Sequence, residues 1–226
     1  MQQRADPPQA DASLRQISIT RYQRHAAGYD ASACFTMPLR ERTISLLQLQ
    51  PGDVVLDVGA GTGLSYPLLS RAVGPTGRVL AFEQSPAMFE HACARVRDEG
   101  LSNVWHVQAS AHDVQLPCRP GAVLFNYVHD ITRMSDAVAN ILRQADAGAR
   151  IAMAGMKYFP WWTGPLNLLA WLKNRPYNAL AVDMWTPWDR VEPHCESFER
   201  WTTHCGMGYI ARGRLRSGDA AAQRTL

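Results

Sequence analysis

The sequence predicts an α/β fold, because short apolar runs of strand length alternate with segments that have helical spacing. An apolar run at 54–58 precedes a glycine-rich turn and a segment, 64–73, whose apolar residues recur every three or four positions. A second strand-like run follows at 78–83, and a helical pattern at 86–99 leads to a third strand at 104–107. Strands that alternate with helices in this way are typical of a mostly parallel sheet.

The size and composition of the chain predict one domain. The chain has 226 residues, of which 46% are hydrophobic, so it can bury a substantial core. We expect this domain to span 14–212. The ends, 1–13 and 213–226, are polar, rich in small residues and without periodicity, and we expect both to be disordered.

Charge and cysteine usage restrict the classes of partner and compartment. The net charge is only +3 and the arginines are scattered, so we expect no nucleic-acid partner. The N-terminus lacks an apolar signal region, no stretch is apolar enough to cross a membrane, and the five cysteines lack close pairing, so we expect a cytoplasmic protein. The pairs His194-Cys195 and His204-Cys205 match no usual zinc spacing, and we expect no metal.

The most informative motif is the turn that follows the first predicted strand, from Asp57 to Gly63. Glycines at 59, 61 and 63 allow a tight backbone turn and a close approach of a ligand, because no Cβ atom is in the way. A dinucleotide-binding G-x-G-x-x-G motif would require glycine at its sixth position, where Leu64 stands. The pattern D-x-G-x-G-x-G instead resembles motif I of the class I methyltransferases that use S-adenosylmethionine (SAM).

This resemblance implies a Rossmann-like, seven-stranded, mostly parallel sheet and a site for SAM and its product S-adenosylhomocysteine (SAH). Glu83 ends the second strand, where an acidic side chain accepts hydrogen bonds from both ribose hydroxyls of a nucleoside. In the family, the residues that follow, here Gln84 to Met88, flank the adenine.

Two positions depart from the family pattern. After the third strand the family commonly has an acid that contacts the adenine, whereas this chain has Ser110, and Asp113 could compensate only if the loop bends back. The fourth strand, 122–125, opens after Gly121 instead of an acid and ends in Asn126, where we expect the transferred methyl group.

The region before motif I resembles the A-x-x-Y-D segment of quinone-precursor and phospholipid-headgroup methyltransferases. Tyr29 of this segment is expected near the sulfonium, which an aromatic ring can stabilise; the alternative is an ordinary core or surface tyrosine. The next segment, 36–49, is expected to be a helix that serves only as scaffold. Together the predicted cofactor-binding residues are Tyr29, Asp57, Gly59, Ala60, Gly61, Gly63, Glu83, Gln84, Met88, Ser110, Ala111 and Asn126.

The second half of the chain concentrates aromatic residues, since six of the seven tryptophans follow residue 160. The fifth strand, 150–156, leads into an aromatic-rich insertion at 157–190, which we expect to form a lid over the substrate. Tyr158, Trp161 and Trp162 are the candidate substrate-binding residues. Alternatively, these rings pack against a small C-terminal strand pair, whose closing strand we expect at 206–213.

His129 is the candidate catalytic residue, because it follows the fourth strand and a neutral histidine can accept a proton near pH 7. The alternative is a histidine that shapes the pocket or hydrogen-bonds to Asp130.

Three functions follow from these patterns. The first is a SAM-dependent methyltransferase that modifies oxygen, nitrogen or carbon of a small, largely apolar or aromatic acceptor. The second is a phospholipid-headgroup N-methyltransferase in peripheral contact with a membrane, because an apolar tryptophan-containing helix could lie on a bilayer. The third is a non-catalytic SAM-binding regulatory protein, which the missing acids at Ser110 and Gly121 allow. The sequence leaves the oligomeric state open.

Overall fold

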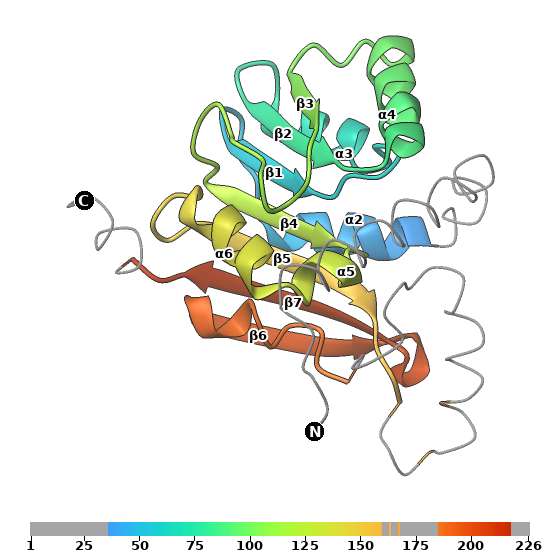
Figure 1. Ribbon diagram of the computed structural model, residues 1–226, viewed down its shortest axis with the longest axis vertical. Helices are drawn as coiled ribbons and strands as arrows, with labels where there is room; N and C mark the ends of the chain where they lie inside the picture. Colours follow the sequence, from blue (N-terminus) through green and yellow to red (C-terminus); the bar gives the residue numbers. More distant parts are fainter. Residues whose placement is uncertain (1–35, 160–162, 164–166, 168–184, 218–226) are drawn as a thin grey trace, which may run out of the picture.

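The structure is a computed structural model that describes residues 36–159, 163, 167 and 185–217 (Figure 1). Tyr29, Trp161 and Trp162 lie outside the described residues, as do the predicted N-terminal tail, residues 218–226 and most of the predicted insertion. The disorder predicted from residue 213 is wrong for 213–215, because these residues belong to the strand that ends at Leu215. The sheet, its helices and the loops between them make up the described part of the chain.

A seven-stranded sheet forms the centre of the molecule, with the strand order β3-β2-β1-β4-β5-β7-β6. The first five strands pair in parallel, and β7 pairs antiparallel with both β5 and β6. This arrangement confirms the predicted α/β fold with a mostly parallel sheet. The strands are β1 (Val54–Val58), β2 (Arg78–Glu83), β3 (Val104–Gln108), β4 (Ala122–Asn126), β5 (Arg150–Met156), β6 (Cys195–Thr203) and β7 (Gly208–Leu215).

Helices cover both faces of the sheet, because alternate residues of each buried strand point to opposite sides. Val55 on β1 packs with Leu47, Leu69 and Ala92, whereas the next residue, Leu56, packs with the opposite cluster. The first face is covered by α2 (Met37–Leu46), α3 (Tyr66–Val73) and α4 (Pro86–Asp98), and the second by α5 (His129–Thr132) and α6 (Ser135–Arg143).

Proline marks the start of three helices on the first face. Pro38, Pro67 and Pro86 each stand in the first turn, where the absent N–H has no partner to lose and the fixed φ suits a helix. With Pro67 in its first turn, the helix predicted at 64–73 begins two residues late, at Tyr66. The helix predicted at 36–49 is shorter than expected and spans Met37–Leu46.

The C-terminal strands show what the sequence pattern missed. β6 is a nine-residue edge strand that apolar periodicity does not predict, because most of its side chains are polar and exposed. Its partner β7 begins and ends two residues later than the predicted 206–213. Short 3-10 helices, η3 (Glu192–His194) and η4 (His204–Gly206), flank β6.

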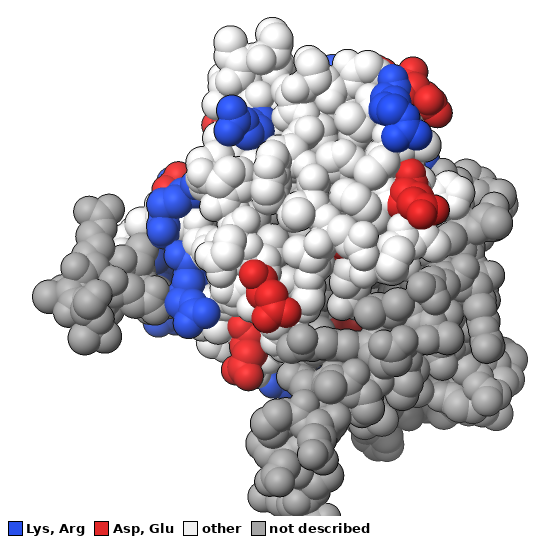
Figure 2. Space-filling model, turned by 45° about the horizontal axis from the view of Figure 1, so that its top comes forward, with Lys and Arg blue, Asp and Glu red and all other residues white. Residues whose placement is uncertain are grey.

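Charged side chains on the described surface are mixed in sign. On the face shown in Figure 2, basic groups lie beside acidic ones, and most of the described area is uncharged. Neighbouring strands β6 and β7 carry such mixed pairs, Arg212 with Glu199 and Arg214 with Glu196. Within the described ranges, no helix is long and apolar enough to cross a membrane.

Candidate functional site

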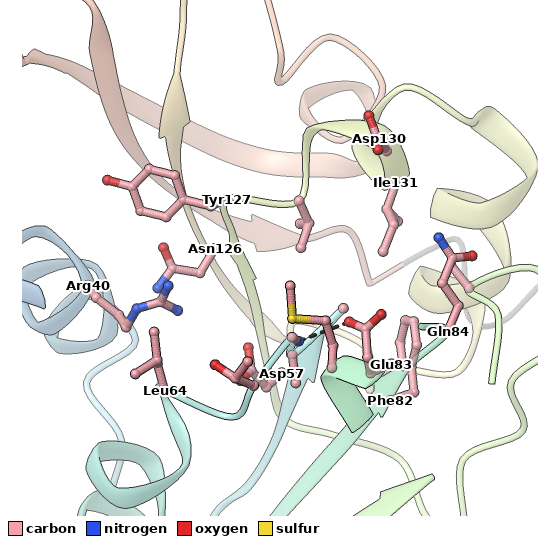
Figure 3. A pocket seen from close by; sticks show the side chains of 17 residues that line it. Arg40, Asp57, Leu64, Phe82, Glu83, Gln84, Asn126, Tyr127, Asp130 and Ile131 are labelled. Atoms are coloured by element: carbon pink, nitrogen blue, oxygen red, sulfur yellow. Dashed lines mark hydrogen bonds between the residues drawn. The ribbon is translucent and has the colours of Figure 1, made fainter. Parts of the chain in front are cut away.

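A pocket lies at the carboxyl ends of β1, β2 and β4, with α2 closing one side (Figure 3). Ligands of open α/β sheets bind at this edge, because the loops that leave the strands converge there. The side chains and turns that line the pocket are Arg40, Asp57, Gly59, Ala60, Gly61, Thr62, Leu64, Phe82, Glu83, Gln84, Met88, Ala111, Asn126, Tyr127, Val128, Asp130 and Ile131.

The glycines of the turn after β1 all have positive φ, from +57° to +76°, but their surroundings differ. A Cβ atom on Gly59 would lie 2.8 Å from Ile131, and one on Gly63 would lie 2.7 Å from the ring of Tyr66. A Cβ atom on Gly61 would meet nothing within 4 Å. Packing therefore requires glycine at 59 and 63. At 61 an added side chain would instead extend into the open space of the pocket.

Glu83 is held at the end of β2 by backbone N–H groups. Oε2 accepts a hydrogen bond from the N–H of Gly61 at 2.9 Å, and Oε1 accepts one from the N–H of Ser85 at 2.7 Å. Burial raises the pKa of Glu83, while these N–H groups favour the ionised form. The carboxylate is thus oriented in advance, and each of its oxygens keeps a further lone pair for a ligand.

Asp57 and Arg40 form a buried polar group with Ser65 beneath the pocket. Burial raises the pKa of Asp57 to about 7, and the nearby Glu83 raises it further, whereas Arg40 and Ser65 oppose the rise. Arg40 donates a hydrogen bond from Nη1 to Ser65 Oγ at 2.9 Å. Asp57 therefore changes its charge state easily when another charged group enters the pocket.

Arg40 corrects the expectation that the helix before motif I is only scaffold. Its side chain is buried, lines the pocket, and places Cζ 5.8 Å from the ring centroid of Tyr127. A signal for it exists in the sequence: Arg40 stands on the same helix face as Ile44 and Leu47, where an apolar residue would be the usual choice.

Several buried polar atoms of the pocket have no hydrogen-bond partner within the described part of the chain. They are Nε of Arg40, Oδ2 of Asp57, and both amide atoms of Asn126, a residue that is only 6% exposed. Buried polar atoms are normally paired, because leaving one unpaired costs roughly 1–3 kcal/mol. Donors and acceptors thus lie side by side at the Arg40 end of the pocket in Figure 3.

The other end of the pocket is mostly apolar. Phe82, Met88 and Ala111 are almost fully buried and line the pocket together with Ile131. Figure 3 shows Ile131 on the side opposite Phe82. This half suits a flat, weakly polar group, with the amide of Gln84 at its edge.

The loop after β3 brings neither Ser110 nor Asp113 to the pocket. Ser110 does not line the pocket; its carbonyl oxygen accepts the N–H groups of Asp113 and Val114, and its hydroxyl accepts that of His112. Asp113 is exposed on this turn, so the loop does not bring it to the pocket. Ala111 is the residue of this loop that faces inward.

Most of the predicted cofactor residues that the structure describes lie together. Gly63 and Ser110 support the turns instead of lining the pocket. Several residues that line the pocket were not predicted. Those that follow β4 could have been inferred, because ligands of open α/β sheets bind at the carboxyl ends of the strands. The missed residues are Arg40, Thr62, Leu64, Phe82, Tyr127, Val128, Asp130 and Ile131.

His129 faces away from the pocket that its neighbours line. Its Nε2 atom accepts a hydrogen bond from the N–H of Met156 at 3.0 Å. Its Nδ1 atom is buried and has no hydrogen-bond partner among the described residues, so the predicted alternative of a hydrogen bond from His129 to Asp130 is not formed. Burial, and to a lesser extent Arg133, lowers the pKa of His129 to about 4. The lone pair that a general base requires is therefore already used.

The aromatic residues beyond β5 form pairs outside the pocket. The rings of Tyr158 and Trp185 lie 5.4 Å apart, and those of Trp188 and Tyr209 lie 5.0 Å apart. Trp188 and Tyr209 are buried, so one tryptophan of the predicted insertion packs on the C-terminal strand pair. Tyr158 itself does not line the pocket.

Among the residues described, no group of three or more His, Cys, Asp or Glu side chains is arranged to hold a metal ion.

The family-model match covers the part of the chain that carries most of the pocket residues, but not those at 126–131. Residues 17–115 match the family model of protein-L-isoaspartate(D-aspartate) O-methyltransferase. The chain is 41% identical over 76 residues to protein-L-isoaspartate O-methyltransferase of Aeropyrum pernix, covering 34% of this chain and 29% of the relative. It is 33% identical over 113 residues to the ubiquinone/menaquinone biosynthesis C-methyltransferase of Ectopseudomonas mendocina, covering 48% and 44%. The chain thus spans less than half the length of these curated relatives.

Solved structures with the same fold cover more of the chain. A SAM-dependent methyltransferase from Aquifex aeolicus superposes with a TM-score of 0.60 at 21% identity, covering 78% of this chain and 89% of the other. An O-methyltransferase family protein from Burkholderia thailandensis gives a TM-score of 0.65 at 14% identity, covering 85% and 59%. At these identities the likeness concerns the fold.

Proposed function

Because this chain belongs to the class I SAM-dependent methyltransferase family, we propose that it transfers a methyl group from SAM to a small, largely apolar or aromatic acceptor. By their names, the relatives act on different acceptors, from isoaspartate in proteins to quinone precursors.

The observation that carries the proposal is the set of unpaired polar atoms at the Arg40 end of the pocket. The methionine part of SAM has a carboxylate, which can accept hydrogen bonds from Arg40. It also has an ammonium group, whose N–H groups can donate hydrogen bonds to the Asp57 carboxylate and to the side-chain carbonyl of Asn126. A zwitterion supplies both the acceptors and the donors that these buried atoms lack. The charge of SAM also favours the ionised form of Asp57, whose pKa of about 7 makes that change easy.

The rest of the pocket fits the nucleoside part of SAM. Glu83 is oriented to accept the ribose hydroxyls, and the apolar half formed by Phe82, Met88, Ala111 and Ile131 suits the adenine ring. Thus a charged end, a carboxylate and an apolar slot follow each other in the order in which SAM carries its groups.

SAM, when bound, supplies a methyl group on positively charged sulfur, so the main task of the protein is to hold the reacting atoms in line. In our proposal, Arg40, Asp57 and Asn126 hold the methionine end and Glu83 holds the ribose. The segment after β4, which lines the same pocket, would border the methyl group. The packing of His129 against β5 argues against a proton-accepting role, so His129 is not proposed as the base.

Aromatic residues support the proposed acceptor class. Tyr158 and Trp185 lie beyond the carboxyl end of β5, and the sequence adds Trp161 and Trp162 between them. Aromatic walls favour flat or apolar molecules. We propose Tyr158, Trp161 and Trp162 as acceptor-binding residues and keep Tyr29 as a proposed neighbour of the sulfonium.

The decisive experiment is incubation with methyl-labelled SAM and a cell extract, followed by identification of the labelled product. Label in a small aromatic or apolar molecule supports the proposal. Label in protein or in phospholipid would contradict the proposed acceptor class. Label in phospholipid would instead support the function at a membrane surface. SAH binding without any labelled product would indicate a regulatory SAM-binding protein.

A further inference from the structure

His129 begins α5, in a short segment whose other members face the cofactor pocket. Asn126, Tyr127, Val128, Asp130 and Ile131 line the pocket, and we call residues 126–131, which run from the last residue of β4 into α5, the pocket loop. His129 is 7% exposed and points the opposite way, toward β5. A buried histidine in this place is therefore available for holding the loop, not for contacting the ligand.

The imidazole joins the pocket loop to the end of β5. Nε2 of His129 accepts the N–H of Met156, the last residue of β5, at 3.0 Å. The low pKa of His129, about 4, keeps the ring neutral and able to accept this hydrogen bond near pH 7. The contact spans two segments that are 27 residues apart in the chain.

Gly155 shows how closely the ring packs on the strand. A Cβ atom at this position would lie 2.4 Å from Cε1 and 2.9 Å from Nε2 of His129, and 3.1 Å from the ring of Tyr209. No ordinary Cβ contact is so short, so glycine at 155 and histidine at 129 fit each other. A side chain at position 155 would therefore displace the His129 ring and, with it, the pocket loop.

A second attachment reaches β5 from Tyr127. Its N–H donates to the carbonyl oxygen of Ala154 at 2.8 Å, and its φ of +61° is uncommon for a residue with a side chain. Backbone in this region persists where the surroundings hold it. The two bonds to β5, at Ala154 and Met156, bracket Gly155.

We propose that His129 is a positioning residue, which fixes the pocket loop on β5 and thereby keeps Val128 and Ile131 in place beside the methyl donor. This inference rests on the proposed function, because it assumes that the pocket binds SAM and SAH. It also explains why a histidine at the catalytic edge of the sheet faces away from the ligand.

The first test measures SAH affinity by calorimetry in folded variants. His129→Ala should bind SAH about tenfold more weakly, since it loses one buried hydrogen bond and the packing on Gly155. His129→Gln can accept the Met156 N–H and should recover most of the affinity. His194→Ala, a histidine near the far edge strand, should bind like the wild type.

The second test uses the contact with Gly155. Gly155→Ala should weaken SAH binding in the wild-type background, because the new methyl group displaces the ring and the loop. In the His129→Ala background the same change should have a much smaller effect, because the clashing ring is gone. Such non-additivity is what direct contact predicts.

The outcomes separate this inference from the proposed function. A wild-type chain that binds neither SAM nor SAH would contradict the function itself. Wild-type binding, together with unchanged SAH affinity in folded His129→Ala and Gly155→Ala, would overturn the positioning role alone. Strictly additive losses would also overturn it.

Discussion

The glycines of the turn after β1 separate two physical reasons for the same residue type. Gly59 and Gly63 are required by neighbouring side chains, whereas Gly61 borders open pocket. Substitution at Gly61 therefore tests the ligand site more cleanly than substitution at its neighbours.

Gly61→Ala should place a methyl group in the pocket and reduce SAH affinity at least about tenfold, with a stability loss on the order of 1 kcal/mol from the positive φ. Gly100→Ala is the matched control, because Gly100 has the same φ of +61° and an added Cβ there would meet no atom within 4 Å, yet it lies outside the pocket. Calorimetry and thermal unfolding on both variants check this. Equal SAH affinity in the two would exclude Gly61 from the site.

Glu83→Ala should weaken SAH binding by roughly 1.5–3 kcal/mol, because charge-assisted hydrogen bonds to the ribose are lost. Glu83→Gln should also be impaired, since both carboxylate oxygens accept backbone N–H groups and an amide NH2 would oppose one of them. The measurement is a comparison of SAH with an analogue that lacks the ribose hydroxyls. If Glu83→Ala weakens both ligands equally, the ribose role is wrong.

Asp57 should make the stability of the free protein depend on pH. Its folded pKa is raised from 3.8 to about 7, so the folded state holds a proton that the unfolded state releases, and stability falls as the pH rises from about 4 to 7. The loss attributable to Asp57 is up to about 4 kcal/mol. Denaturant unfolding of the wild type and Asp57→Asn at several pH values isolates this contribution, because the variant lacks it. Parallel pH profiles would contradict the raised pKa.

At the level of elements, α2 acts as a wall of the pocket. Its apolar side chains Leu39 and Ile44 pack on the core, and Arg40 enters the same buried face to reach Ser65 and Tyr127. One turn of helix thus combines packing with polar contact to the ligand site. The periodicity of apolar residues predicts that α2 packs on the core, but it does not predict the contact of Arg40 with the pocket.

Arg40→Met should keep the length of the side chain and remove its charge, so SAH should bind more than about tenfold more weakly if Arg40 holds the carboxylate. Adenosine lacks that carboxylate and should bind the variant almost as it binds the wild type. Arg42→Met, on the exposed face of the same helix, is the control. An equal loss for SAH and adenosine would indicate a structural role for Arg40.

At the level of the whole molecule, the sheet order brings the pocket together. β1 lies between β2 and β4, so Asp57, Glu83 and Asn126 reach one edge from strands that are far apart in the chain. The antiparallel pair β7 and β6 extends the sheet on the side of β5, where the aromatic pairs lie. Cofactor and acceptor functions are thus proposed for adjacent parts of one sheet.

Trp161→Ala and Trp162→Ala, at positions outside the described residues, should lower the transfer of labelled methyl to the acceptor while SAH affinity stays within about twofold. Loss of an aromatic wall commonly costs a few kcal/mol of binding when the ring is buried against its partner. The measurement is the ratio of transfer rate to SAH affinity in folded variants. Small, equal changes in both would assign these rings to packing.

Local patterns were sufficient to predict the alternation of strands and helices, the glycine turn and the position of Glu83, because each depends on neighbours close in the chain. Periodicity reveals a buried strand such as β1, and positive φ restricts the turn to glycine. These features also predicted the mostly parallel sheet and most of the pocket.

The direction in which individual side chains point depends instead on tertiary packing. His129 and Asn126 lie at the end of the same strand, yet packing on Gly155 turns the histidine to β5 while the amide stays in the pocket. Arg40 joins the site because α2 packs across the strand ends, a contact between segments that are distant in sequence. Such orientations depend on the space left by residues from other elements, which no local pattern records.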